Sequence, residues 1–152
     1  MNEALQILIL SLSLNSASIM NSTKYDSSLF SDVFSIVAKD LGLDTAKITI
    51  TICNAEFNPD INSQGSVNRY GTDYWINIQD LFKPEAIKVF IHELVHVSQS
   101  YHNRMRVMKY FVLFEGKAYY SNVPYSERPF EVEAMQLTDQ LWSKYRKALK
   151  SL

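Results

Sequence analysis

The chain has 152 residues, 47% of them hydrophobic, and its formal net charge at pH 7 is −1. This is enough for one domain with a hydrophobic core, and we expect a single domain over residues 1–152. The near-neutral charge and the lack of a basic block argue against nucleic acid as a partner, and a single cysteine, Cys53, excludes an internal disulfide.

The first predicted element is the apolar stretch at residues 4–14. Glu3 precedes it and the first basic residue is Lys24, whereas a secretory signal begins with positive charge. Its serine and asparagine interruptions make it too short and polar to span a membrane. We therefore expect the first buried element of the domain, no stable membrane insertion and a cytoplasmic protein. If the stretch is a signal cleaved at residues 16–18, the protein is secreted instead.

The rest of the chain shows alternating helix and strand patterns. Helical spacing of apolar residues, Asp26 or Ser27 as a cap and Gly42 as a stop predict the first helix. Cys53 falls in a run rich in β-branched residues, where we expect it to be an inert, buried strand residue. The predicted elements are a helix at 27–41, a strand at 46–53, a loop at 54–64, a hairpin at 66–78, a helix at 84–101, a hairpin at 107–120 and a helix at 131–150.

Residues 92–96 read His-Glu-Leu-Val-His. On an α-helix, His92 and His96 are one turn apart, about 6 Å along the axis, and point the same way. Both imidazoles can therefore reach one Zn²⁺ ion. Glu93 lies beside them, where it can take the proton of a water molecule at the metal. The motif predicts a zinc site with Glu93 as a catalytic base.

The helix that carries this motif has two unlike faces. Pro84 suits its first turn, and Glu85 suits the positive end of its dipole. His92, His96 and Gln99 lie on one side of the helical wheel. The opposite side is apolar and is formed by Ile87, Phe90, Ile91, Leu94, Val97 and Tyr101. We expect this helix to contact the core with its apolar side and to present both histidines to another surface.

Three residues compete to be the third zinc ligand. His102 has the spacing of a longer motif in which a glycine ends the helix, but Gln99 stands at the glycine position. Glu131 and Glu133 begin the last predicted helix, and Glu131 falls within its apolar sector. A carboxylate there is unfavourable unless it is paired or bound to metal, so Glu131 is the expected ligand. Glu133 better fits an exposed residue of the first turn.

Three segments together resemble a known family. They are His-Glu-Leu-Val-His-Val-x-Gln at 92–99, Gly-Lys-x-Tyr at 116–119, and Tyr-x-x-Arg-Pro-Phe-Glu-x-Glu-Ala at 125–134. The combination resembles the gluzincin branch of the zincin metallopeptidases, and small bacterial and phage zincin-like proteins in particular. The resemblance covers about residues 74–136. It implies a zincin-like α+β domain with a small mixed or antiparallel sheet, an active-site helix and a C-terminal helix.

The resemblance also implies roles for single residues. His92, His96 and Glu131 would bind Zn²⁺, and Glu93 would be the general base of a metallopeptidase that hydrolyses a peptide or protein substrate. The oxyanion that forms during hydrolysis needs a hydrogen-bond donor. The candidates in the segment before Glu131 are Tyr119, Tyr120, Tyr125 and Arg128.

Two other readings of the sequence remain open. The first is a zinc-stabilised module that binds a protein without turnover, and the second is a structural protein without metal. Glu93 favours the enzyme, because a purely structural zinc site needs no base. In either metal-binding reading, the predicted strand at 74–78 is placed along the rim of the site. If its edge is exposed there, it can pair with an extended peptide by strand addition.

Overall fold

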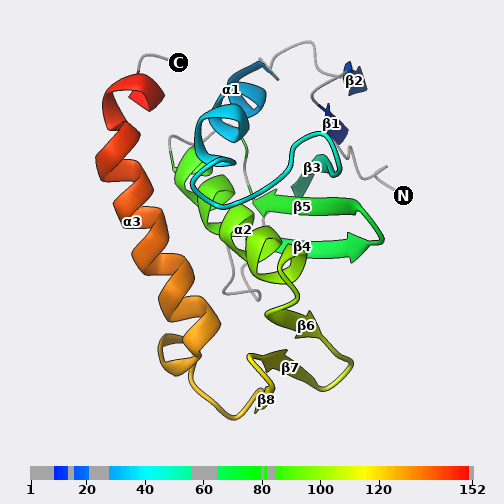
Figure 1. The fold of residues 1–152 in the computed structure, drawn as a ribbon, viewed down its shortest axis with the longest axis vertical. Helices are drawn as coiled ribbons and strands as arrows, with labels where there is room; N and C mark the ends of the chain where they lie inside the picture. Colours follow the sequence, from blue (N-terminus) through cyan, green and yellow to red (C-terminus); the bar gives the residue numbers. More distant parts are fainter. Residues whose placement is uncertain are drawn as a thin grey trace, which may run out of the picture.

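The computed structural model describes residues 9–13, 16–20, 28–55, 65–79, 81 and 85–150. The predicted caps Asp26 and Ser27, the helix-start residue Pro84 and most of the predicted loop at 54–64 lie outside this part of the chain. The described elements confirm the predicted α+β class (Figure 1). They are β1 (Ile9–Ser13), β2 (Ser16–Met20), α1 (Ser28–Val37), β3 (Thr49–Ala55), β4 (Gly65–Tyr70), β5 (Asp73–Gln79), α2 (Ala86–Tyr101), β6 (Met105–Val107), β7 (Phe111–Phe114), β8 (Lys117–Tyr120), a 3₁₀ turn (Tyr125–Glu127) and α3 (Pro129–Lys150).

The larger sheet is mixed and has the strand order β2-β1-β3-β5-β4. Strands β3 and β5 are parallel, with Ile50 opposite Tyr74 and Ile52 opposite Ile76, and the other pairs are antiparallel. The hairpin expected at 66–78 is confirmed as β4 and β5. The sequence left open whether β5 has an exposed edge, and it has none because it is paired on both sides. The edge strand is β4, which sequence patterns did not indicate because the β3–β5 pairing is long-range.

Helices α1 and α2 cover one face of this sheet and enclose the core. Alternation along β5 sends Tyr74, Ile76 and Ile78 into that core, all at 0% exposure, while the residues between them are half-buried. The two helices meet through Phe30 and Phe90, whose rings form an edge-to-face pair at 5.0 Å. The core therefore lies directly behind the helix that carries the His-Glu-x-x-His motif.

Helix α2 is buried on both faces, which differs from the amphipathic pattern. Leu94 and Val97 contact the core as expected, but Glu93, His96 and Gln99 are also buried. Helix α3 causes this difference, because it runs alongside α2 and covers its polar face (Figure 1). The histidines are presented to a neighbouring helix rather than to open solvent.

Helix α3 begins at Pro129, two residues before the predicted start. Within its apolar sector, Ala134 and Leu141 are buried, whereas Met135 and Ala148 are exposed. Leu149 and Thr138 are also buried. The Thr138 hydroxyl donates to the Ala134 carbonyl and needs no other partner. No helix among the described residues is long and apolar enough to cross a membrane.

A second sheet, in the order β6-β7-β8, lies between the end of α2 and the start of α3. The turn between β7 and β8 is at Glu115 and Gly116, as predicted, and both have positive φ. The hairpin expected at 107–120 is instead part of a three-stranded sheet, because the chain also turns at residues 108–110 and begins a strand at Met105. This sheet forms the lower part of the molecule in Figure 1.

Replacing Phe90 should destabilise the fold strongly. Phe90→Ala removes a fully buried ring and its contact with Phe30, which should cost about 3–5 kcal/mol. Urea unfolding followed by circular dichroism measures this change. The matched control is Tyr110→Ala, because Tyr110 is 70% exposed and its loss should change stability by under about 0.5 kcal/mol. Similar losses for the two variants would mean that the core is not where we place it.

Candidate metal centre

Helix α2 places the side chains of His92 and His96 side by side. Their Nε2 atoms are 3.1 Å apart and their rings are nearly perpendicular. His96 is buried, and His92 keeps 16% of its side chain exposed. One turn of helix therefore provides two imidazole nitrogens aimed at the same point, as their spacing predicted.

Glu131 completes this group from the first turn of α3. Its Oε2 atom lies 3.1 Å from the Nε2 atom of His92 and 3.1 Å from that of His96. The three atoms thus form a triangle with nearly equal sides. Two ligands at about 2.0–2.1 Å from one tetrahedral zinc ion are about 3.3–3.4 Å apart, so these donors fit such an ion closely. These residues could hold a metal ion.

His102 does not join this group. Its Nε2 atom lies 3.2 Å from the carbonyl oxygen of Leu41, on another side of α2. Asn103 ends the helix in a left-handed conformation, while the Asn103 and Arg104 amides donate to the carbonyls of Ser100 and Gln99. This is the Schellman motif with asparagine in the glycine position. The helix therefore continues past Gln99, and His102 stays far around the axis from His96.

Glu133 also lies outside the triangle. It follows Glu131 by two residues, which turns its side chain about 200° around α3. It is not the exposed residue expected from the sequence, because its carboxylate accepts hydrogen bonds from Gln99 (2.7 Å) and Arg104 (2.9 Å). Glu133 therefore holds Gln99 and Arg104 in place and is not one of the candidate ligands.

Gln99 sets the orientation of His96. Its amide nitrogen donates to the Phe130 carbonyl and to Glu133, so its oxygen faces Nδ1 of His96 at 2.8 Å. That oxygen can only accept, which places the imidazole proton on Nδ1. The lone pair of Nε2 then faces Glu131 and His92. Partners of this kind orient metal-binding histidines in many proteins.

Phe130 and Pro129 position Glu131. Pro129 lacks the backbone N–H that a first helical residue leaves unpaired, and it fixes the direction of the entering chain. Phe130 is buried and contacts the rings of His96, Phe114 and Tyr119. The residue before Glu131 is thus anchored on both the motif helix and the second sheet.

The charges of this group favour an ionised carboxylate. Burial acts to raise the pKa of Glu131, but its contacts with His92 and His96 outweigh burial and hold that pKa well below its usual range. Burial acts to lower the pKa of His96, but Glu131 and Glu93 raise it overall. When Nε2 is unprotonated on both histidines, lone pairs of all three residues meet at the centre of the triangle, and a cation there would relieve their repulsion.

Glu93 is buried beside the triangle but is not part of it. Only 4% of the residue is exposed, and burial raises the pKa of its carboxyl to about 7. Among the described residues, no hydrogen bond involves this carboxylate. A Cβ atom added to Gly65 would lie 2.6 Å from Oε1 of Glu93 and 2.9 Å from its Cγ. The start of β4 therefore accommodates Glu93 only because residue 65 is glycine, a role that sequence patterns did not indicate.

Tyr125 is the oxyanion candidate that lies nearest the triangle. Its hydroxyl is 3.4 Å from Nε2 of His92. Desolvation and the neighbouring Glu131 raise the pKa of this phenol, so it stays protonated at neutral pH. Arg128 does not pair with an acid here; it bonds the carbonyls of Val123 and Ser121 and lies over the Tyr125 ring.

Tyr119 and Tyr120, the remaining oxyanion candidates, lie on β8. Tyr119 packs against Phe130, and Tyr120 is 53% exposed beside Phe111. Neither has a contact with His92, His96 or Glu131 among the described residues. Cys53 is buried on β3, as predicted, and burial raises the pKa of its thiol.

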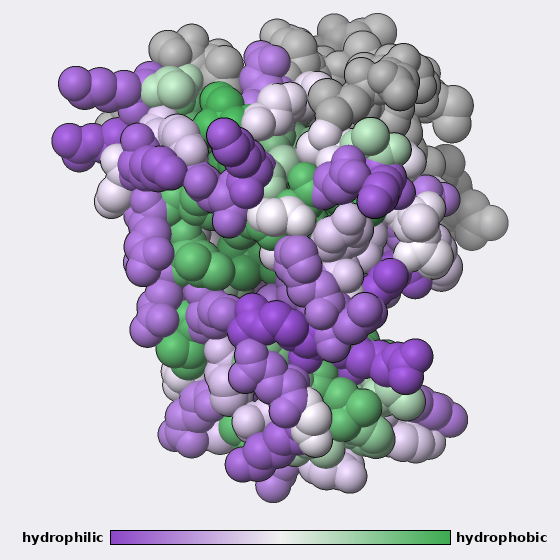
Figure 2. All heavy atoms as spheres, viewed as in Figure 1, coloured by the Kyte–Doolittle hydropathy of each residue, from purple (hydrophilic) through white to green (hydrophobic). Residues whose placement is uncertain are grey.

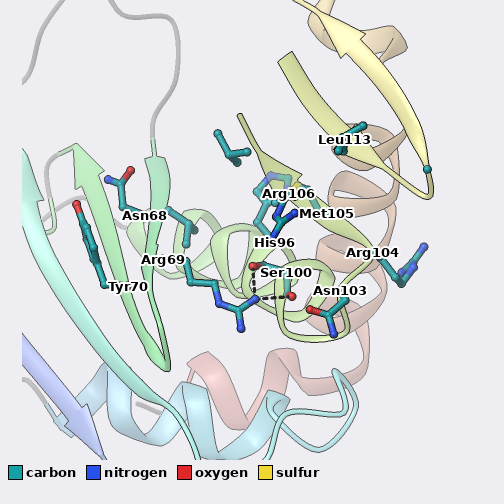
Figure 3. Close-up of a pocket in the computed structure, with 13 residues that line it drawn as sticks. Asn68, Arg69, Tyr70, His96, Ser100, Asn103, Arg104, Met105, Arg106 and Leu113 are labelled. Carbon is teal, nitrogen blue, oxygen red and sulfur yellow. Dashed lines mark hydrogen bonds between the residues drawn. The ribbon is translucent and has the colours of Figure 1, made fainter. Parts of the chain in front are cut away.

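A cleft of about 840 Å³ opens beside the triangle, between β4 and the second sheet. His96 and Ser100 of α2 line it, together with β4 residues on one side and β6 residues on the other (Figure 3). The outline of the molecule is indented at the same edge (Figure 2). The candidate metal ligands therefore border a cleft that is large enough for part of a polymer chain.

Comparisons with protein-family models, with curated proteins and with solved structures found no match to this chain.

Loss of Glu131 should weaken zinc binding. Changes around the ligands of a metal typically lower affinity by about 10- to 100-fold, so Glu131→Ala, which removes a ligand, should cost about 100-fold or more. Competition with a chromophoric chelator measures the dissociation constant. His102→Ala is the control and should leave it unchanged. A loss for His102→Ala as large as for Glu131→Ala would show that the wrong third ligand has been assigned.

Proposed function

We propose that the chain is a zinc-dependent metallopeptidase of the gluzincin type. The observation that supports this most is the triangle of His92 Nε2, His96 Nε2 and Glu131 Oε2, with sides of 3.1 Å. Two imidazoles and one carboxylate are the ligand set of catalytic zinc sites in several peptidases, which keep a fourth position open. When bound, zinc would lower the pKa of a water molecule and polarise the scissile carbonyl.

Glu93 fits the role of general base in this proposal. Its carboxylate lies on the same helix turn as the ligands and makes no hydrogen bond among the described residues, so it is available to a substrate or water. We infer that it accepts the proton of the attacking water and passes it to the leaving amine. Tyr125, held as a neutral phenol near His92, would donate a hydrogen bond to the oxyanion.

The unpaired edge of strand β4 supports the proposal that the substrate is a peptide. It pairs with β5 on one side, and no strand of the described chain pairs with its other side. An extended peptide can add to such an edge through backbone hydrogen bonds. Because β4 borders the cleft that contains His96, a peptide bound there would pass beside the metal ligands. We therefore infer strand addition at β4 and not at β5, for which the sequence raised it on the condition of an exposed edge.

A zinc-stabilised binding module is the alternative function. It would use the same edge and cleft, and it would need the metal only to join α2 and α3. The buried Glu93 argues against it, because an unpaired carboxylate in the interior is unfavourable unless function requires it.

Glu93→Gln should abolish hydrolysis while leaving the metal in place. The amide keeps the shape of the side chain and loses the base, so cleavage of heat-denatured casein should fall by about 10²- to 10⁴-fold. Zinc affinity and melting temperature, measured on the same samples, should change little. Wild-type turnover by this variant would remove Glu93 from the mechanism. Zinc-loaded wild-type protein that cleaves no unfolded substrate would instead favour the binding module.

Gly65→Ala should misplace the base without removing the metal. The new methyl group would meet the Glu93 carboxylate, whose displacement should lower kcat/KM by about 10- to 100-fold. Ser66→Ala is the control, because Ser66 is the exposed neighbour on the same strand. Zinc affinity should be unchanged in both variants. Full activity of Gly65→Ala would show that the contact with Glu93 has no role in catalysis.

A further inference from the structure

The cleft beside the metal group is lined by arginines and by no acidic residue among those described. Arg69 comes from β4, Arg104 follows α2, and Arg106 comes from β6, so cations face the space from both of its sides (Figure 3). The chain as a whole is slightly acidic, with a net charge of −1. The positive charge of the cleft is therefore a local feature and not a consequence of composition.

Two of these arginines have no acidic partner in the part of the chain that the structure describes. Arg104 is neutralised by ion pairs with Glu115 (2.6 Å) and Glu133 (2.9 Å). Arg69 instead donates to neutral acceptors, which are the carbonyls of Gly71 and Ser100 and the Ser100 hydroxyl. Arg106 is exposed and forms no ion pair with any described residue. Two positive charges thus remain available to a molecule in the cleft.

The position of Arg69 indicates how far this positive charge lies from the candidate metal ligands. Its guanidinium is held 2.9 Å from the carbonyl of Ser100. Ser100 lies one helical turn, about 6 Å along the axis, beyond the ligand His96. An extended peptide covers that distance in about two residues. A side chain that meets Arg69 would therefore belong to a residue about two positions from a bond held at the metal.

We propose that the cleft selects peptides that carry aspartate or glutamate within about two residues of the scissile bond. This proposal rests on the peptidase function proposed above and adds its substrate class. Arg69 is fixed in place by three hydrogen bonds, so it meets a carboxylate with little loss of side-chain freedom. Arg106 faces it across the cleft and adds a second, more mobile charge.

A peptide fits this cleft better than a nucleic acid does. The unpaired edge of β4 offers backbone N–H and C=O groups along the cleft wall, which an extended peptide backbone can match. A nucleic acid has no such backbone and typically binds through a wider basic surface. The positive charge here is confined to two available arginines.

Binding can be measured apart from hydrolysis. The probes are three fluorescein-labelled peptides of equal length that differ only in carrying acidic, amide or basic residues, and an oligo-dT strand of similar length. Each is titrated by fluorescence anisotropy into the zinc-loaded full chain with Glu93→Gln. The same titrations use Arg69→Gln and Arg106→Glu in that background, with Arg146→Gln, an exposed arginine of α3, as the matched control.

We expect the acidic peptide to bind about 3- to 10-fold more tightly than the amide peptide, as two exposed charge pairs would give. Arg106→Glu and Arg69→Gln should each reduce this preference, Arg146→Gln should not, and added salt should weaken it. Equal binding of the three peptides, a preference for the basic one, or tighter binding of oligo-dT would overturn the proposal.

Cleavage gives an independent measurement. Wild-type protein is incubated with a peptide mixture from a digested proteome, and new termini that are absent with Glu93→Gln are identified by mass spectrometry. Enrichment of aspartate and glutamate near these termini supports the proposal, and cleavage without it overturns the acidic preference but leaves the peptidase intact. If no new termini form while the acidic peptide still binds selectively, the peptidase function fails and the acidic specificity stands.

Discussion

The contact between the first turn of α3 and the middle of α2 is the constraint on which the rest of the site depends. It brings three electron-rich atoms, two from imidazoles and one from a carboxylate, to within 3.1 Å of each other in a largely buried place. Such an arrangement is stable only with protons or a metal ion among the three atoms. The aromatic contacts of Phe130 and the fixed entry at Pro129 maintain it, and Glu93 and Tyr125 are placed around it.

Polar contacts extend this constraint to the second sheet. His96 is bonded to Gln99, Gln99 to Glu133, and Glu133 to Arg104, which in turn pairs with Glu115 in the turn between β7 and β8. The orientation of one candidate metal ligand and the position of the hairpin are therefore set by the same chain of bonds. The lower wall of the cleft is thereby held in a defined position relative to the triangle.

Features of the site that depend on local residue spacing could be predicted from the sequence. Helical periodicity placed His92 and His96 together, and the apolar sector of the last helix indicated Glu131 over Glu133. The roles of Gly65 and Gln99 were not predictable, because each depends on a contact with an element distant in the chain. Which strand of the hairpin lies at the sheet edge was not predictable for the same reason, since a hairpin pattern does not tell which of its strands meets a third. Asn103 ends α2 without a glycine, because asparagine also adopts the left-handed conformation.

The candidate metal ligands come from two helices, and His96 and Glu131 are 35 positions apart in a stretch that includes the whole second sheet. An ion held by both would act as a reversible cross-link that closes this segment into a loop. Its binding energy would be shared with the docking of α3, and at a free concentration of 100 times the dissociation constant it would add about 2.7 kcal/mol to stability. Metal availability would then decide how firmly the C-terminal third of the protein is attached to the rest.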